Sequence, residues 1–131
     1  MDKVRDKAGD PPADRYDIAT DVLFPQGTHM DVAALAASIQ PWANRTLTAV
    51  NEAVVRLGVL DGDFHWHKHD GEDEFFFVLE GRLDIELPDR MVSLAPGQGV
   101  TVPAGMMHLP HARGRTVVLM VEKGSVDARG D

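Results

Sequence analysis

The segment from Gly62 to Gly81 constrains the fold of this chain most strongly; it reads GDFHWHKHDGEDEFFFVLEG. It places His67, His69 and Glu74 in the pattern His-x-His-x4-Glu. Because side chains at positions i and i+2 of a strand point to the same face, the two imidazoles would project together. The polar run DGED is typical of a tight reversal, after which Glu74 would begin a returning strand. The segment therefore predicts three ligands of a metal site on a β-hairpin.

A second segment suggests a fourth ligand. Residues 97–108 read GQGVTVPAGMMH, in the pattern Gly-x5-Pro-x-Gly-x2-His. Val100 and Val102 would form a short strand, and the Pro103-Ala104-Gly105 sequence favours a turn. His108 then supplies the next imidazole that the site could use.

Together the two segments resemble the paired motifs of the cupin superfamily, in particular its compact bacterial members of the cupin 2 type. In that family the equivalents of His67, His69, Glu74 and His108 bind a divalent metal inside a small barrel. The resemblance implies an all-β fold, the double-stranded β-helix or jelly-roll barrel. One departure is Ala112, which stands where the second motif usually ends with an asparagine that is not a ligand.

The sequence divides the chain into two parts. Residues 1–20 are rich in charge, proline and small side chains, which predicts a flexible arm. The remainder, residues 21–131, is expected to form a single cupin barrel domain. Within it, VAALAASIQ (32–40) predicts one short helix on the outside of the barrel, with Asp31 as N-cap and Pro41 as stop.

Downstream of that helix the apolar period changes to two, which predicts about eight short strands in a sandwich or barrel. The Asp61-Gly62 dipeptide indicates a turn. In the strand that carries His67 and His69, Phe64 and Trp66 would point away from the ligand face.

The strand after the hairpin has large apolar groups on both faces. Phe76 and Val78 share the inner face with Glu74, whereas Phe75 and Phe77 lie on the outer face. Because both faces must then be covered, the outer one is expected to contact a second sheet, the helix or another copy of the chain. A homodimer through this face is the expected assembly.

Other residues near the motifs have more than one reading. His65 has the parity to face the cavity, as pocket wall or as support for a ligand. His111 is expected at the barrel mouth or on the surface, and Asp73 is expected to be a solvated turn residue. Met106 and Met107 would either line the entrance or belong to the core.

The composition narrows the partners. A chain of 131 residues with a net charge of −8 fits one domain and disfavours nucleic acid or an anionic membrane as partner. The absence of cysteine excludes disulfides and thiolate ligands. The sequence starts without a signal-peptide pattern and has no long apolar run, so a cytoplasmic protein is expected.

Three imidazoles and one carboxylate suit Fe²⁺, Mn²⁺, Ni²⁺, Zn²⁺ or Co²⁺ and are too rich in nitrogen for Ca²⁺ or Mg²⁺. Four protein ligands on a six-coordinate ion leave two open positions, as a catalytic site needs. We therefore expect a metal-dependent enzyme of dioxygenase, isomerase or lyase type, acting on a small oxygenated molecule. Catalytic residues beyond the ligands stay unknown, and few basic residues are available for a phosphosugar. The alternative is a cupin that binds or senses a small ligand without turnover.

Overall fold

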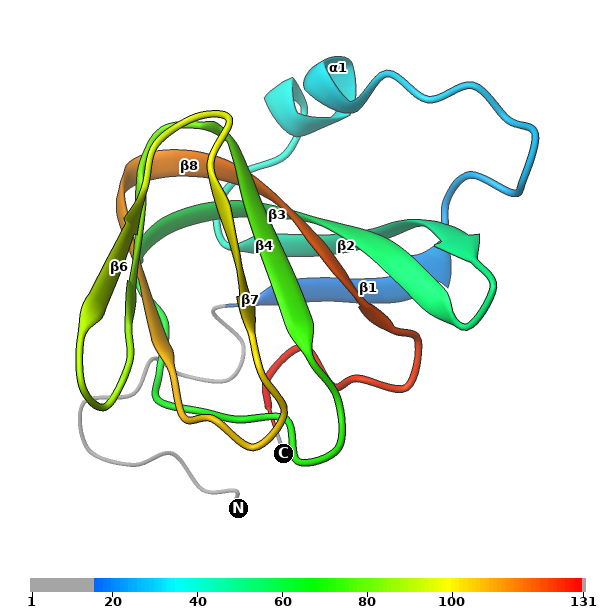
Figure 1. Cartoon of the computed structure of the whole chain (residues 1–131). Coiled ribbons are helices and arrows are strands. Elements are labelled where there is room, and N and C mark those ends of the chain that lie inside the picture. The colour runs from blue at the N-terminus through cyan, green and yellow to red at the C-terminus, as the bar shows by residue number, and fades with distance from the viewer. Residues whose placement is uncertain (1–15, 131) are drawn as a thin grey trace.

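The computed structural model describes residues 16–130, which form a β-barrel with one short helix (Figure 1). The all-β expectation is confirmed. The elements are β1 (Asp17–Val22), α1 (Val32–Ala37), β2 (Ala43–Val50), β3 (Ala53–Asp63), β4 (Glu74–Glu80), β5 (Leu83–Glu86), β6 (Met91–Leu94), β7 (Gly99–Val102) and β8 (Leu109–Lys123). Among the described residues, no helix is long and apolar enough to cross a membrane.

The strands form one eight-stranded sheet, in which β8 is the shared element. The main order is β1-β2-β3-β8-β4-β7, and β5 pairs with β8 and with β6. Strand β8 pairs with β3 along both of its halves, and on its other edge its first half pairs with β5 and its second half with β4. Gly114 lies between these two parts with a φ of 84°, a backbone conformation that glycine adopts without strain. By changing partners there, β8 joins the two sides of the barrel.

A predominantly apolar core fills the barrel. Its buried members come from β3, β4, β5, β6, β7 and β8 and from the segments that flank the strands. They are Tyr16, Trp42, Leu60, Phe76, Val78, Leu83, Ile85, Leu87, Leu94, Val102, Ala112, Val118 and Met120.

The expected helix forms, and it is shorter than the sequence pattern. Asp31 caps it as expected, since its Oδ1 accepts a hydrogen bond from Ala34 N at 3.0 Å. The helix ends at Ala37 rather than at residue 40. It covers the outside of the sheet over β2, β3 and β8, where buried Ala36 belongs to a cluster with four apolar side chains: Leu47, Leu57, Val59 and Val117.

The expected arm is only partly within the described residues. Residues 1–15 lie outside them, but residues 16–20 are part of the barrel. Tyr16 is 6% exposed in the core, and β1 pairs in parallel with β2. The sheet therefore begins earlier than the predicted boundary at residue 21.

The predicted turn at Asp61-Gly62 is wrong. These residues continue β3, and Gly62 pairs with Ala112 after a shift of register that follows Leu60. Gly62 has a φ of 88°, so the glycine that suggested a turn serves a β-bulge instead.

The predicted hairpin of residues 67–74 is wrong as well. Residues 64–73 contain no regular strand, and their one ladder contact is an isolated bridge between His67 and His108. The two edges of β4 are already paired with β7 and β8, so β4 has no edge left for the histidine segment. Without strand alternation, Phe64 does not point away: it packs against the barrel core.

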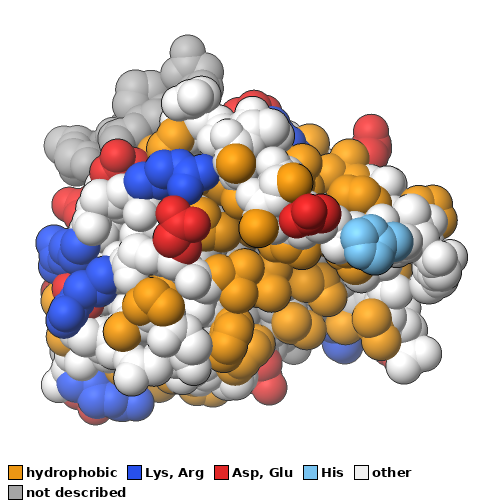
Figure 2. Space-filling model, turned by 90° about the horizontal axis from the view of Figure 1, so that it is seen from above, with side chains coloured by type: hydrophobic (Ala, Val, Ile, Leu, Met, Phe, Trp, Pro, Cys, Tyr) orange, Lys and Arg blue, Asp and Glu red, His pale blue; other side chains and the backbone are white. Residues whose placement is uncertain are grey.

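The two faces of β4 are as expected. Phe76 and Val78 are buried inside, whereas Phe75 and Phe77 are half-buried outside. The outer side chains stand in rows across β3, β8 and β4, because Val121 pairs with Phe75 and Leu119 with Phe77. Apolar side chains also gather on one face of the molecule in Figure 2.

Replacing Gly81 by alanine is expected to destabilise the barrel more than the same change at Gly97. Both have positive φ, 86° and 84°, so alanine costs about 1–2 kcal/mol of backbone strain at either site. At Gly81 the new Cβ would also lie 2.6 Å from Arg115 O, whereas nothing lies within 4 Å at Gly97. This overpacking adds about 1–3 kcal/mol. Urea denaturation of Gly81→Ala and Gly97→Ala measures the difference, and equal losses would contradict it.

Candidate metal centre

The four side chains singled out by the sequence lie together inside the barrel. One ligand atom from each of His67, His69, Glu74 and His108 lies within 4.8 Å of the others, and all four residues are buried. They come from separate places: two from the loop of residues 64–73, one from the start of β4 and one from the position before β8. The cluster could hold a metal ion.

Backbone hydrogen bonds fix the two motif segments against each other. His67 N donates to His108 O at 3.0 Å, and His108 N donates to His67 O at 2.8 Å. Gly105 N donates to His69 O at 2.8 Å. Gly105 has a φ of 79°, as the turn before His108 requires. The irregular loop is thus held in place by the second motif.

The hydrogen bonds of the imidazoles set which nitrogen faces the cluster. His67 Nδ1 donates to His65 O at 2.9 Å, and His108 Nδ1 donates to Met106 O at 3.0 Å. In both rings Nε2 is then the nitrogen left for the cluster, and in a neutral ring its lone pair can bind a metal.

The remaining ligand atoms meet at Glu74. Its Oε1 lies 3.1 Å from His69 Nε2 and 3.4 Å from His108 Nε2. His108 Nε2 is buried and makes no hydrogen bond within residues 16–130. A buried polar atom without a partner is costly, and a metal ion at this point would supply one. With metal–ligand distances of about 2.0–2.2 Å, four such atoms need only a small contraction to share one ion.

Burial keeps the site ready for a cation. It lowers the pKa of His67 to about 3, together with the nearby His108, so this imidazole is neutral at pH 7. Burial acts to raise the pKa of Glu74, but contacts with Glu122, His108 and His69 outweigh it and lower that pKa. A neutral imidazole, that of His67, beside an ionised carboxylate is the combination of protonation states that metal binding requires.

Glu122 and Arg56 support Glu74 from behind, and sequence reasoning missed both. Arg56 forms a buried ion-pair contact with Glu122 Oε2 and donates to Val126 O at 2.8 Å. Burial and the Glu74 carboxylate raise the pKa of Glu122 to about 10, against the opposing effect of Arg56. The raised pKa favours the protonated form of Glu122, which could donate a hydrogen bond to Glu74.

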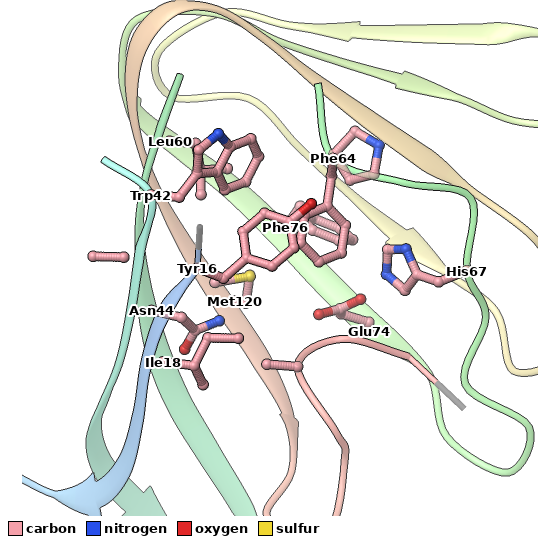
Figure 3. A pocket seen from close by; sticks show the side chains of 13 residues that line it. Tyr16, Ile18, Trp42, Asn44, Leu60, Phe64, His67, Glu74, Phe76 and Met120 are labelled. Atoms are coloured by element: carbon pink, nitrogen blue, oxygen red, sulfur yellow. The ribbon is translucent and has the colours of Figure 1, made fainter. Parts of the chain in front are cut away.

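A pocket opens beside the cluster, on the side of His67 and Glu74, whose side chains both point into it (Figure 3). The space between atoms there is about 480 Å³, including the part open to solvent. Its lining is Tyr16, Ile18, Trp42, Ala43, Asn44, Leu60, Phe64, His67, Glu74, Phe76, Pro110, Met120 and Ala128.

The two other histidines near the motifs have separate roles. His65 stacks on Phe64 with ring centroids 4.0 Å apart, and its Nε2 donates to Arg129 O at 2.7 Å. His65 is therefore outside the cluster, and its backbone oxygen supports His67, which agrees with the second of its two predicted roles. His111 lies between Asp63 Oδ1 at 2.7 Å and Glu86 Oε1 at 3.0 Å, away from the cluster.

The remaining motif residues are placed as follows. Met106 packs against the core, whereas Met107 is exposed, and neither lines the pocket. Trp66 is also exposed. Asp73 is exposed but not merely solvated: its Oδ1 accepts a hydrogen bond from Ala104 N at 2.9 Å, which adds another link between the two motifs.

Several pocket residues have little local signal in the sequence. Tyr16 was assigned to the arm, although the alternation of Ile18, Thr20 and Val22 could have indicated a strand. Asn44 and Ala128 have no such pattern, because only the folded sheet brings their segments to the pocket. Glu122 is a polar residue at an inward position of an apolar strand, which could have marked it for attention.

An eight-stranded barrel that buries three histidines and a glutamate defines a cupin whose site fits a metal ion. The profile of the Cupin_2 family, described as a cupin domain, matches residues 53–122. That match spans more than half of the chain, from the start of β3 nearly to the end of β8. The chain belongs to this family, which confirms the resemblance drawn from the two motifs.

The chain is also similar to individual proteins in sequence or in fold. The uncharacterized protein YdbB of Bacillus subtilis (strain 168) is 40% identical over 81 residues, which cover 61% of this chain and 72% of YdbB. A cupin-2 domain containing protein from Shewanella frigidimarina has a TM-score of 0.69 at 28% identity, covering 72% of this chain and 93% of its own. BH2720 from Bacillus halodurans is similar in fold, with a TM-score of 0.67 at 18% identity over 84% of this chain and 90% of its own.

Glu122→Ala is expected to lower the free energy of unfolding by about 3–5 kcal/mol, because it leaves Arg56 buried without its partner. Glu122→Gln keeps an acceptor for Arg56 and a donor for Glu74. If Glu122 is protonated, this variant should stay within about 1 kcal/mol of the parent. Urea denaturation of both variants at pH 7 is the measurement. A glutamine variant as unstable as the alanine variant would mean that Glu122 acts as a carboxylate.

The free energy of unfolding should also decrease as pH rises, because His111 loses its proton. Burial and Arg113 act to lower its pKa, but Asp63 and Glu86 outweigh them and raise it. A raised folded-state pKa contributes stability that is complete below the unfolded value and is lost as pH rises through the folded value. Asp63→Asn should therefore flatten the curve of unfolding free energy as pH rises above about 6.5, the ordinary pKa of histidine. The exposed neighbour supplies the control, Asp61→Asn, which should leave the curve unchanged.

Proposed function

We propose that the chain is a metal-dependent enzyme of the cupin family, acting on a small molecule. The residues that would hold the ion are His67, His69, Glu74 and His108, and the ion is Fe²⁺, Mn²⁺, Ni²⁺, Zn²⁺ or Co²⁺. The observation that carries the proposal is His108 Nε2, a buried nitrogen that makes no hydrogen bond within the described residues and lies 3.4 Å from Glu74 Oε1.

The chain's own residues prepare the site. Burial keeps His67 neutral, and the backbone carbonyls of His65 and Met106 fix the rings of His67 and His108. Glu122 holds Glu74 in place by a hydrogen bond. When bound, a divalent ion supplies Lewis acidity, or a site for O₂ if it is iron, at the positions that the protein leaves open. The pocket beside His67 and Glu74 supports access of a small molecule to that ion.

The reaction type among dioxygenase, isomerase and lyase chemistry follows from the substrate rather than from the fold. A second candidate is a cupin that binds a small ligand without turnover. It is favoured by one observation: within the described residues, the titratable groups that line the pocket are Tyr16, His67 and Glu74. If the latter two bind metal, no histidine or carboxylate there remains as a general base. Turnover of any compound in a substrate panel would decide for the enzyme.

A homodimer stays a prediction, as does a cytoplasmic location. The outer face of β3, β8 and β4 supports the dimer, because Val121 and Leu79 are exposed there beside half-buried Phe75 and Phe77. The apolar rows run across paired strands, a surface that a second copy could match about a two-fold axis. The mass measured by sedimentation would test it.

His69→Ala is expected to lose most bound metal, because one of the four ligands is removed. The barrel should stay folded, because backbone hydrogen bonds hold the two motif segments together. The matched control is His65→Ala, since that side chain is near the cluster but outside it. It should retain about one equivalent at saturating metal. Metal content is measured by mass spectrometry on protein purified without a nickel column, with circular dichroism to verify folding. An unchanged metal content in His69→Ala would refute the ligand assignment.

The same measurement on the parent protein identifies the ion. Iron retained under anaerobic conditions would support oxygenase chemistry and justify oxygen-uptake assays. Zinc, manganese, nickel or cobalt would favour isomerase or lyase chemistry by a Lewis acid. If no metal binds even after reconstitution, the proposal fails.

A further inference from the structure

Most side chains that line the pocket beside the cluster are apolar, and this restricts the molecules that it can bind. We propose that it takes a small, neutral, flat molecule about the size of one ring, largely apolar, with one or two oxygen donors at the end that meets His67 and Glu74. Phosphorylated sugars and other polyhydroxylated anions are excluded. The position of the oxygen donors rests on the proposed metal site, whereas the apolar character of the body rests on the pocket alone.

The charges in the pocket argue against an anion. The residues from 16 to 130 that line it include no lysine or arginine. Its one acidic group is the carboxyl of Glu74, which is one of the four residues of the proposed metal site. Phosphate recognition needs a guanidinium, an ammonium or several aligned backbone amides. A phosphate in this pocket would have to rely on the metal alone.

Aromatic rings form one side of the pocket, and they are packed on one another in advance. Tyr16 lies 4.7 Å from Phe64 and 5.5 Å from Trp42 between ring centroids, and Trp42 lies 5.4 Å from Phe64. Each ring is held by the other two, so the wall is preformed. A flat apolar body would gain contact area against it.

The hydroxyl of Tyr16 does not make this wall polar. It lies 3.3 Å from His65 Nδ1, and His65 is not a pocket residue. His65 Nε2 must donate to Arg129 O, so Nδ1 accepts and the Tyr16 hydroxyl is its donor. What Tyr16 presents to the pocket is therefore its ring. A polyol would leave several hydroxyls without partners against these walls, at a cost for each.

Besides the Tyr16 hydroxyl and the buried Nε1 of Trp42, which makes no hydrogen bond within the described residues, the lining has polar side chains at two places. His67 and Glu74 stand together, and in Figure 3 Asn44 lies on the far side of Tyr16 and Met120 from His67. The oxygen donors of the bound molecule belong at the first place, and one further polar group could meet the amide of Asn44. Between them the lining is apolar, which suits a ring-sized body: a cavity of about 150 Å³ already holds benzene.

The C-terminal segment after β8 closes the pocket with a small side chain. Ala128 lines it, between Val126 O, which accepts from Arg56, and Arg129 O, which accepts from His65. Gly130 also lies against His67, because a Cβ there would be 2.5 Å from His67 Cβ. Ala128 is half-buried, so a larger side chain at this position would reduce the pocket without disturbing the barrel core.

Nitrogen-15 amide spectra test the proposal on zinc-loaded and metal-free protein. Acetophenone, a neutral ring with one carbonyl, is expected to shift the amides of Trp42, Asn44 and Phe64 saturably in both forms, and at least threefold more tightly with zinc. Glucose 6-phosphate should bind at least tenfold more weakly than acetophenone. Equal or tighter binding of glucose 6-phosphate, or no saturable shift with acetophenone in either form, would overturn the proposal.

Two variants on the same segment localise the effect. Ala128→Phe should weaken acetophenone binding at least fivefold, with metal content unchanged. Ser125→Phe places the same side chain at an exposed position outside the pocket and should leave the affinity unchanged. Equal affinities in the two variants would show that acetophenone binds elsewhere.

The failures of the two proposals are distinguishable. If zinc does not bind but acetophenone shifts the pocket amides of the metal-free protein, the metal site fails and the apolar pocket stands. If zinc binds and acetophenone does not, the pocket assignment fails alone.

Discussion

Two backbone hydrogen bonds between His67 and His108 hold together segments that have no strand ladder between them. The loop of residues 64–73 is irregular, so ordering it has a conformational cost that these bonds and the one from Gly105 N to His69 O must offset. The histidines can converge only while this loop keeps its place. The second motif therefore holds the first in place and also supplies the third histidine of the cluster.

Electrostatics add a second layer of support. The cluster combines the neutral imidazole of His67 with one ionised carboxylate, and Glu122 and Arg56 lie behind that carboxylate. In a metal-free protein this arrangement costs folding free energy, because buried polar atoms lack hydrogen-bond partners. A bound cation would remove this cost, because it would be a partner for those atoms. The distribution of charge in the barrel is thus asymmetric, with arginine behind Glu74 and no cationic side chain in the described lining of the pocket.

Much of this could be predicted from the sequence, because the informative features are local. The spacing of His67, His69 and Glu74 and the turn before His108 are sufficient to identify the motifs. The hairpin could not be judged locally, since it depends on whether β4 has a free edge, and β7 and β8 take both. Tyr16, Asn44 and Ala128 were missed for a related reason. Their approach to the pocket is a result of sheet pairing between distant segments, which no short pattern records.

Strand β8 begins next to His108 and carries Glu122 near its end, so it touches the cluster at two points. Its side chains alternate: Val118 and Met120 face the barrel core, whereas Leu119 and Val121 belong to the outer apolar face. Met120 lines the pocket and its neighbour Val121 is exposed on the outer face. The pocket and the outer apolar face are therefore separated by a single layer of backbone.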